Sequence, residues 1–371
     1  LGDDRPDGTS AYEDALAAQS DAHPAVRVEE DWPAWVRYTS GTTGKPKGSV
    51  NTHRGWYTLG QTMNAAWGIG EDDVLLANGP VSHTGGTMGV NHIGTGASVV
   101  VHPGFDGRET LRAIAEDGIT NIFMVPTQFE MVLEALRELG GPGAIDAPAL
   151  RVLITAGAPM SAGLKARIAE AFPAAGLYEF YSATEAPMMT ILRPEEQRTK
   201  PGSVGQPRGT SILSIRDEEG NELPPGEIGQ IWASNPMVHL GYHERPEANA
   251  ETSRDGFVTV GDLGRFDEDG YLYLIGRKAD MIISGGFNVY PQEVEAVLVE
   301  HPAVHAAAVY GVADQRWGEM VCAACVLAPG AEVTGEELEA WCRRSLSGYK
   351  VPRRLAFVDE LPIAEGKVLR R

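Results

Sequence analysis

Residues 38–48 read Tyr38-Thr-Ser-Gly-Thr-Thr-Gly-Lys-Pro-Lys-Gly48 and form the most informative stretch of the chain. The glycines let the backbone turn several N–H groups toward one anion, while the serine and threonine hydroxyls donate hydrogen bonds and the lysines supply positive charge. The stretch is not a Walker A loop, because Gly44-Lys45 is followed by Pro46 instead of a serine or threonine. The pattern predicts a loop that holds phosphate groups, and a flexible surface loop is the alternative.

The composition of the 371-residue chain is that of an ordinary soluble globular protein, with 43% hydrophobic and 22% charged residues. Its length predicts two or more domains, since single hydrophobic cores seldom grow so large. The 51 acidic and 31 basic residues give a net charge of −20, which argues against a general nucleic-acid-binding protein. No apolar run approaches the ~20 residues of a membrane-spanning helix, so we expect no membrane span.

Apolar runs alternate with helix-like stretches between Val36 and Gly202, which predicts α/β units with a parallel sheet. Buried strands are expected at 74–77, 97–101, 121–125 and 151–155, and helices at 107–117 and 127–139. After Gly202, short strands at 212–215, 229–232 and 271–274 predict a β-rich subdomain. From Gln292 onward we expect a helix, strands at 305–310 and 322–327, and a helix at 334–346. The fold class is therefore an α/β large domain with a β-rich subdomain, followed by a small α+β C-terminal domain.

Two sets of metal-like spacings have simpler explanations. Cys322 and Cys325 match a CxxC motif, but on a strand residues three apart point to opposite faces, so we expect both to pack in the core. His301 and His305 could form a metal pair on a helix, but Pro302 and the apolar run after it favour a strand. The odd number of cysteines, with Cys342 as the third, fits a reducing compartment, and we expect a cytoplasmic protein.

Further motifs follow the phosphate loop in a fixed order: Tyr181-Ser-Ala-Thr-Glu185, Val260-Gly-Asp262, Gly276-Arg277-Lys-Ala-Asp280 with Ser284-Gly-Gly-Phe-Asn288, and Tyr349-Lys-Val-Pro352 to Gly366-Lys367. Together they resemble the signature of the adenylate-forming, or AMP-binding, superfamily, and the chain is most like an acyl- or aryl-CoA ligase. The family carries a substantial portion before the phosphate loop, which here begins at residue 38. We therefore expect the sequence to lack the family's first N-terminal subdomain.

The resemblance also implies how the chain is divided. Residues 1–276 would form the remainder of the large adenylation domain, with 202–276 as its β-rich subdomain. Residues 277–280 would be a hinge, and residues 281–371 a mobile C-terminal domain that rotates between two half-reactions. The hinge position matches Ala279, where the family commonly has Asp or Lys.

The same resemblance assigns the ATP site. The β- and γ-phosphates would be held by the loop residues Thr39, Ser40, Gly41, Thr42, Thr43, Gly44, Lys45 and Lys47. The adenine would lie against Gly157, Ala158, Phe180 and Tyr181. Asp262 and Arg277 would contact the ribose, Thr184 the α-phosphate, and Glu185 the Mg²⁺ ion. Lys367 would carry the adenylation step, because a compact ammonium can follow the charge at the forming anhydride.

The acyl and thiol sites are assigned in the same way. His83, Gly85, Gly86, Ala156 and Met188 would border a pocket for a hydrophobic or aromatic acid, with His83 arguing against an α-amino acid. Ser284, Gly285 and Gly286 would line the path of the thiol.

The sequence therefore predicts an ATP-dependent carboxylate–CoA ligase that uses ATP, Mg²⁺ and coenzyme A. Its partners would be a small-molecule carboxylic acid and CoA, with no nucleic acid, and a homodimer is kept open. One alternative is an adenylating enzyme that loads the phosphopantetheine of a carrier protein. Another is a nucleotide-binding fragment without catalytic activity.

Overall fold

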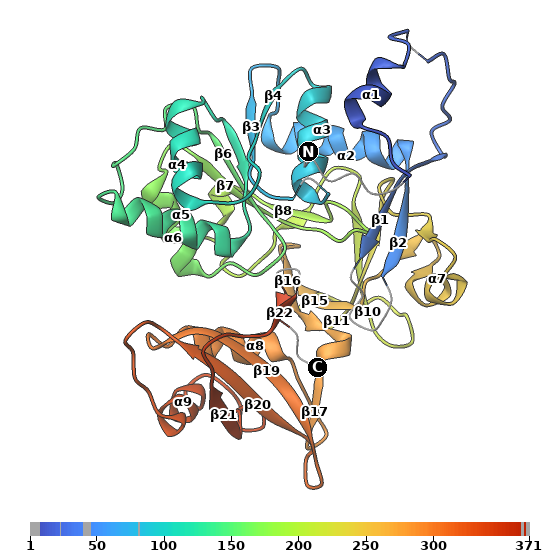
Figure 1. Cartoon of the computed structure of the whole chain (residues 1–371). Helices are drawn as coiled ribbons and strands as arrows, with labels where there is room; N and C mark the ends of the chain where they lie inside the picture. Colours follow the sequence, from blue (N-terminus) through green and yellow to red (C-terminus); the bar gives the residue numbers. More distant parts are fainter. Residues whose placement is uncertain (1–7, 23, 40–45, 81, 365–366, 369–371) are drawn as a thin grey trace.

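The computed structural model describes residues 8–22, 24–39, 46–80, 82–364 and 367–368, with side chains as far as Pro362. A seven-stranded sheet in the order β4-β3-β5-β6-β7-β8-β9 forms the centre of the large unit, by which we mean the described residues up to Arg277 (Figure 1). Its strands are β3 (Val74–Ala77), β4 (Ser98–Val101), β5 (Asn121–Phe123), β6 (Val152–Thr155), β7 (Gly176–Tyr181), β8 (Thr190–Leu192) and β9 (Gln206–Pro207). Strands β3 to β7 pair parallel with one another, while β8 pairs antiparallel with both β7 and β9. The predicted parallel α/β sheet is confirmed.

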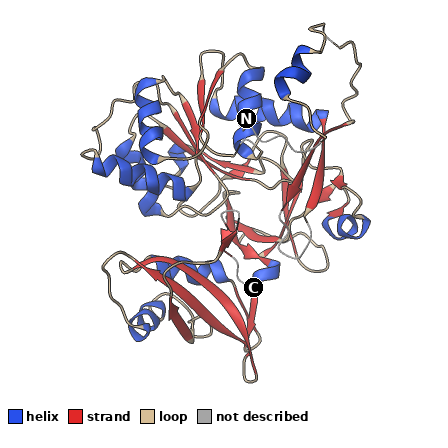
Figure 2. Cartoon of the chain, in the orientation of Figure 1, coloured by secondary structure: helices blue, strands red, loops and turns tan. Residues whose placement is uncertain are grey.

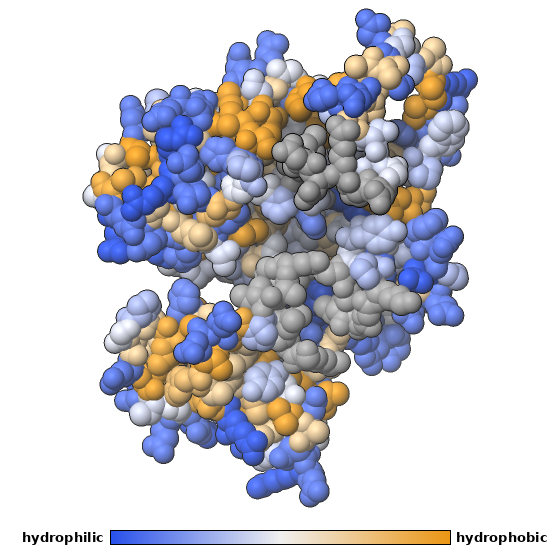
Figure 3. All heavy atoms as spheres, viewed as in Figure 1, coloured by the Kyte–Doolittle hydropathy of each residue, from blue (hydrophilic) through white to orange (hydrophobic). Residues whose placement is uncertain are grey.

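Helices cover both faces of this sheet (Figure 2). One face packs against α4 (Gly107–Glu116), α5 (Pro126–Glu138) and α6 (Ala162–Ala171), and the other against α2 (His53–Trp67) and α3 (Thr84–Gly94). Successive residues of a strand therefore pack into hydrophobic clusters on opposite faces of the sheet. Leu76 packs in the cluster with α4, α5 and α6, and Leu75 packs in the cluster with α2 and α3. Near the edge strand β4, Val101, Val90 and Ile93 are exposed, and apolar atoms gather in this part of Figure 3.

A smaller sheet in the order β1-β2-β12 carries the phosphate-loop sequence. It comprises β1 (Pro33–Thr39), β2 (Lys47–Thr52) and β12 (Gly241–Tyr242), all antiparallel. Helix α7 (Pro246–Thr252) contacts β12 of this sheet, and helix α1 (Tyr12–Ala17) precedes β1 in the chain. Since β12 is distant in sequence, the loop hairpin is joined to a segment almost 200 residues away.

The β-rich part forms a six-stranded sheet in the order β13-β14-β11-β15-β16, with β10 paired to β11. Its strands are β10 (Ile212–Arg216), β11 (Gly229–Ser234), β13 (Ser253–Arg254), β14 (Phe257–Val258), β15 (Asp262–Phe266) and β16 (Leu272–Arg277). Two 3₁₀ turns stand outside the sheets: η1 (Pro194–Glu196) and η2 (Lys278–Asp280). The predicted division at residue 276 and the hinge at 277–280 stay predictions, with Ala279 in η2.

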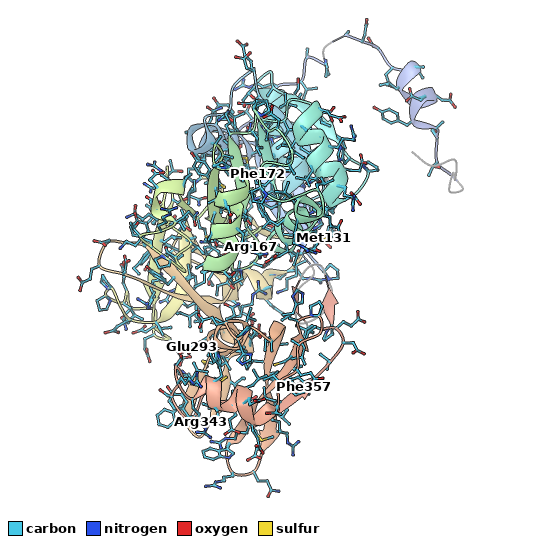
Figure 4. All side chains as sticks on the ribbon, turned by 90° about the vertical axis from the view of Figure 1, so that its left-hand side faces the viewer. Met131, Arg167, Phe172, Glu293, Arg343 and Phe357 are labelled. Carbon is cyan, nitrogen blue, oxygen red and sulfur yellow. The ribbon has the colours of Figure 1, made fainter. Side chains whose placement is uncertain are left out.

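The C-terminal unit, from Ile282 onward, has a sheet in the order β18-β17-β20-β19, with β21 parallel to β20. Its elements are β17 (Ile282–Ser284), β18 (Phe287–Val289), α8 (Pro291–Val299), β19 (Val304–Asp314), β20 (Gly318–Leu327), α9 (Gly335–Cys342), β21 (Arg354–Phe357), β22 (Ile363–Ala364) and β23 (Lys367–Val368). Figure 4 shows the two units from the side, with Phe172 on the large unit and Phe357 on the C-terminal unit.

Three details of this unit bear on the sequence predictions. The helix predicted at 334–346 ends at Cys342, and a turn returns Leu346 to the apolar core. All three cysteines are free and buried, and burial raises the pKa of the Cys325 and Cys342 thiols to about 11, so the prediction of core packing is confirmed. His305 lies on β19, so the helical spacing of a metal pair does not apply.

No helix in the described ranges is long and apolar enough to cross a membrane.

Candidate active site

The two ends of the predicted phosphate loop are held by a β-hairpin. Thr39 ends β1 and lies opposite Lys47 at the start of β2, and the Thr39 hydroxyl donates to the Lys47 carbonyl at 3.4 Å. The loop residues between them, 40–45, lie outside the described residues, so the predicted roles of Ser40, Gly41, Thr42, Thr43, Gly44 and Lys45 stay predictions. The Lys47 ammonium lies 5.1 Å from the centre of the Tyr242 ring, on the neighbouring strand β12.

Glu185 lies in the segment that follows β7, with only 7% of the residue exposed. The Tyr242 hydroxyl donates to Glu185 Oε1 at 2.6 Å, a length typical of a hydrogen bond to an ionised carboxylate. Burial and the charge of Glu185 raise the pKa of Tyr242, so the phenol keeps its proton. The carbonyl of the preceding residue, Thr184, accepts from Arg37 Nη2 at 3.5 Å. Burial lowers the pKa of Arg37, an effect that Glu185 opposes.

The backbone around Glu185 is fixed from a second direction. The His239 N–H donates to the Glu185 carbonyl at 2.9 Å, and the His239 ring lies edge-on to the Tyr242 ring at 4.9 Å. His239 Nδ1 is 3.0 Å from the Ser49 hydroxyl on β2. Glu185 is thus linked to the strand that leaves the phosphate loop.

Asp262 and Arg277 are brought together by the register of β15 and β16, which places them directly opposite each other. Arg277 Nε lies 3.2 Å from Asp262 Oδ1, and the Tyr181 hydroxyl donates to Asp262 Oδ2 at 2.6 Å. Burial first, and the Asp262 charge second, raise the pKa of Tyr181 well above its ordinary value. The two residues predicted to bind ribose therefore form one group with a tyrosine predicted for the adenine slot.

The remaining adenine residues do not all share one face. Gly157 follows β6 with φ +91°, a conformation that favours glycine, and Ala158 comes directly after it. Phe180 is buried against Trp67 and Phe123, with ring centres 5.9 and 6.2 Å away, whereas Tyr181 lies in the apolar cluster of the β-rich part. Neighbouring positions on β7 point in opposite directions, so the structure separates Phe180 from Tyr181.

The residues predicted for the acyl pocket fall into two groups. Ala156 and Met188 are buried in the same apolar cluster as Phe180. Met188 has φ 50°, rare for a side chain of its size, and hydrogen bonds involving Ser182 and Ser211 hold its backbone. His83 is exposed and precedes α3, whose first turn contains Gly85 and Gly86.

The predicted thiol loop is a tight turn between β17 and β18. Gly285 and Gly286 both have positive φ, and the Gly285 N–H donates to the Trp317 carbonyl at 2.7 Å. A Cβ on Gly285 would come within 3.0 Å of the Trp317 ring, which explains the glycine. Ser284 is buried, and its hydroxyl has no partner among the described residues. Lys367 lies in β23, paired with Ala364, and its side chain is outside the description.

Two models of known protein families match consecutive parts of the chain that contain these motifs. A model described as AMP-binding enzyme matches residues 2–243, and one described as AMP-binding enzyme C-terminal domain matches residues 293–366. The chain belongs to the AMP-binding enzymes.

Two relatives of this AMP-binding enzyme are named as CoA ligases. Feruloyl-CoA synthase from Amycolatopsis sp. is 37% identical over 361 residues, which cover 96% of this chain and 72% of the relative. A 2-succinylbenzoate–CoA ligase from Geobacillus sp. is 38% identical, covering 91% of this chain and 68% of the relative. By this relationship the chain is an enzyme of the AMP-forming acid–thiol ligase type.

Solved structures of the family agree with this fold. The o-succinylbenzoate CoA synthetase of Bacillus subtilis, in complex with its acyl-adenylate, superposes with a TM-score of 0.84 at 32% identity, covering 96% of this chain and 72% of that one. ATP-bound MatB from Rhodopseudomonas palustris gives a TM-score of 0.87 at 32% identity, covering 98% and 72%. The B. subtilis enzyme has also been solved with ATP and magnesium ion.

The residues around Glu185 fit a magnesium ion in this AMP-binding enzyme. A carboxylate oxygen is a ligand that Mg²⁺ prefers, and the ion commonly takes its other ligands from substrate phosphates and water. Glu185 therefore suits a metal that arrives together with the nucleotide.

Several residues of the site were not predicted from the sequence: Arg37, Ser49, His239 and Tyr242. Tyr242 lies 57 residues from its partner Glu185, and no local pattern distinguishes it among the 11 tyrosines of the chain. The pairing of β12 with β2 brings it to the site.

Proposed function

We propose that the chain is an ATP-dependent carboxylate–CoA ligase that activates a hydrophobic or aromatic acid as an acyl-adenylate and then transfers it to CoA. The observation that carries the proposal is the grouping of two carboxylates, the buried Glu185 and the partly buried Asp262, beside the end of β7. The two carboxylates share an electrostatic environment. The charge of Glu185 raises the pKa of Tyr181, the partner of Asp262, and the charge of Arg277 lowers the pKa of Tyr242, the partner of Glu185. One carboxylate can then serve a cation and the other the ribose of the same nucleotide.

In the first step, a carboxylate oxygen of the acid attacks the α-phosphorus of ATP, a P–O bond forms, and the bond to pyrophosphate breaks. Asp262 accepts hydrogen bonds from the ribose hydroxyls, and Arg277 keeps its carboxylate in place. The hairpin of β1 and β2 holds the loop that contacts the outer phosphates. Mg²⁺ supplies charge neutralisation on the phosphates when it is bound through Glu185. Lys367 contacts the oxygens at which charge develops, since such a step needs mainly positioning and electrostatic stabilisation.

In the second step, the CoA thiol attacks the acyl carbon, the C–S bond forms, and AMP leaves with the electron pair of the C–O bond. The turn of Ser284, Gly285 and Gly286 lines the thiol's path after rotation at Ala279. Glycines at this turn allow the chain to approach the thiol closely.

A hydrophobic or aromatic acid is supported by the pocket residues. Ala156 and Met188 contribute to an apolar cluster with Phe180, where a charged or polar acyl group would lose hydration without compensation. The feruloyl and o-succinylbenzoyl groups named for the relatives are aromatic. A cytoplasmic location belongs to the same proposal, because all three cysteines are free thiols.

ATP–pyrophosphate exchange tests the proposal, with carboxylic acids pooled as aryl, medium-chain, long-chain, polycyclic and amino acids. We expect exchange with the aryl or a fatty-acid pool, followed by thioester formation when CoA is added. Thioester formation with a phosphopantetheinyl carrier but not with CoA would favour the carrier-loading alternative. Nucleotide binding without exchange in any pool would refute the proposed ligase activity.

A further inference from the structure

The hydrogen bond between Tyr242 and Glu185 has the properties of a contact that orients the carboxylate. Its length is 2.6 Å, and both residues are 7% exposed, so water competes little for either group. The phenol occupies Oε1 and thereby fixes the rotation of the carboxylate about its last bond. A carboxylate oriented in this way presents its other oxygen in one direction.

Tyr242 is itself fixed by the sheet that carries the phosphate loop. It pairs with Ser49 of β2 in the β-ladder, and its N–H donates to Asn249 Oδ1 at 2.7 Å. The Lys47 ammonium lies on one side of the ring at 5.1 Å from its centre, and the His239 ring meets it edge-on. Lys47 and Ser49 both belong to β2, the strand that follows the phosphate loop, so these contacts hold the tyrosine in place relative to β2.

We propose that Tyr242 is a positioning residue that holds the Glu185 carboxylate in a fixed orientation relative to strand β2, so that a divalent cation bound through Glu185 is received in one direction. The inference rests on the proposed function only in assigning Glu185 to the divalent cation. It adds a residue from β12 that acts through Glu185 and does not touch the nucleotide itself.

The test is the binding of Mn²⁺, followed by electron paramagnetic resonance, to the full chain in the presence of the unreactive analogue α,β-methylene-ATP. Tyr242→Phe removes the hydroxyl and keeps the ring that Lys47 and His239 contact. Because a hydrogen bond to a charged group is lost, we expect about tenfold weaker Mn²⁺ binding. Tyr271→Phe is the matched control, since the Tyr271 hydroxyl donates to Glu196 Oε1 at 3.1 Å elsewhere in the large unit. It should leave Mn²⁺ affinity unchanged.

A double-mutant cycle separates positioning from a general structural effect. If Tyr242 acts through Glu185, the pair Tyr242→Phe with Glu185→Gln binds Mn²⁺ no more weakly than Glu185→Gln alone. Equal Mn²⁺ affinity in the wild type and Tyr242→Phe would overturn the inference, as would additive losses in the double variant. So would unchanged affinity in Glu185→Gln. The assay contains no acid and no CoA, so failure of the ligase proposal would show in the exchange assay and not here.

Discussion

Two tyrosine–carboxylate pairs, one buried and one partly buried, lie near each other, and they differ in charge compensation. The bond from Tyr181 to Asp262 and the bond from Tyr242 to Glu185 have the same length, 2.6 Å. Asp262 also pairs with the Arg277 guanidinium, whereas Glu185 makes no ion pair in the described part of the chain, and the nearby Arg37 bonds to the Thr184 carbonyl instead. We propose that a carboxylate in direct contact with an arginine suits neutral ligands such as ribose hydroxyls, while a carboxylate whose arginine acts on it only through space attracts a cation. In this proposal the direct contact with an arginine, and not the hydrogen bond from a tyrosine, distinguishes the two carboxylates.

The largest effect is expected for Glu185→Gln, which keeps the shape of the side chain and removes its charge. At a fixed Mg²⁺ concentration, ATP–pyrophosphate exchange should fall by about 10²–10³-fold, the range seen when an electrostatic stabiliser is removed from an active site. The Mg²⁺ concentration for half-maximal exchange should rise steeply. Glu196→Gln is the control, since Glu196 also accepts from a tyrosine, and an equal change in its Mg²⁺ dependence would break the comparison.

Asp262→Asn should give a smaller loss of a different kind. The amide can accept from one ribose hydroxyl but loses the charge and the ion pair with Arg277, so KM for ATP should rise about 10–100-fold. The Mg²⁺ dependence should not change. Steady-state ATP–pyrophosphate exchange, measured with ATP and Mg²⁺ varied independently, distinguishes the two carboxylates. If both variants needed more Mg²⁺ for half-maximal exchange, the separate roles of Asp262 and Glu185 would be refuted.

Tyr181→Phe sharpens the comparison further, because it leaves the Asp262–Arg277 pair in place. We expect KM for ATP to rise only about 3–10-fold, the range of an ordinary hydrogen bond, because Asp262 keeps its ion pair with Arg277. The same exchange assay measures it. A loss as large as that of Asp262→Asn would mean that the tyrosine, and not the arginine, maintains the ribose carboxylate.

The smallest effect on catalysis is expected at Asp73, a buried carboxylate that lies outside the site. Arg151 donates to both of its oxygens; burial alone would raise the pKa of Asp73, but hydrogen bonds from Arg151 and Thr120 lower it to about 2. Because the pKa of Asp73 is lowered in the folded protein, its ionised carboxylate stabilises the fold at pH values above the ordinary pKa of 3.8. This stability is lost as the pH falls from 3.8 toward 2. The contribution is about 2 kcal/mol.

Asp73→Asn should therefore lower the free energy of unfolding at pH 7 and leave the KM values for ATP and Mg²⁺ unchanged. Urea denaturation between pH 7 and pH 3 measures the difference from the wild type, which should shrink below about pH 4. A difference that stays constant down to pH 3 would contradict the lowered pKa of Asp73.

The sequence predicted the sheet better than it predicted the contacts of the site. Apolar runs located β3 and β6 within a residue of their bounds, since buried parallel strands are apolar on both faces. Helix α3 was not predicted individually, because its sequence includes four glycines, which have a low helix propensity. Burial of residues such as Met88 and His92 stabilises the helix instead. Asp262 and Glu185 could be assigned from motifs, whereas Tyr242 needed the pairing of β12 with β2 to be known.

The burial of the three cysteines makes the protein ready for site-specific chemical labelling. Cys322, Cys325 and Cys342 are all buried, and raised pKa values near 11 keep two of the thiols protonated and slow to react with maleimides. Cysteines introduced on exposed positions of the two units would then react selectively, without first replacing the native ones. A donor and an acceptor dye placed in this way, one on α4 and one on α9, would report the predicted rotation at residues 277–280 as a change in energy transfer when ATP, acid and CoA are added in turn.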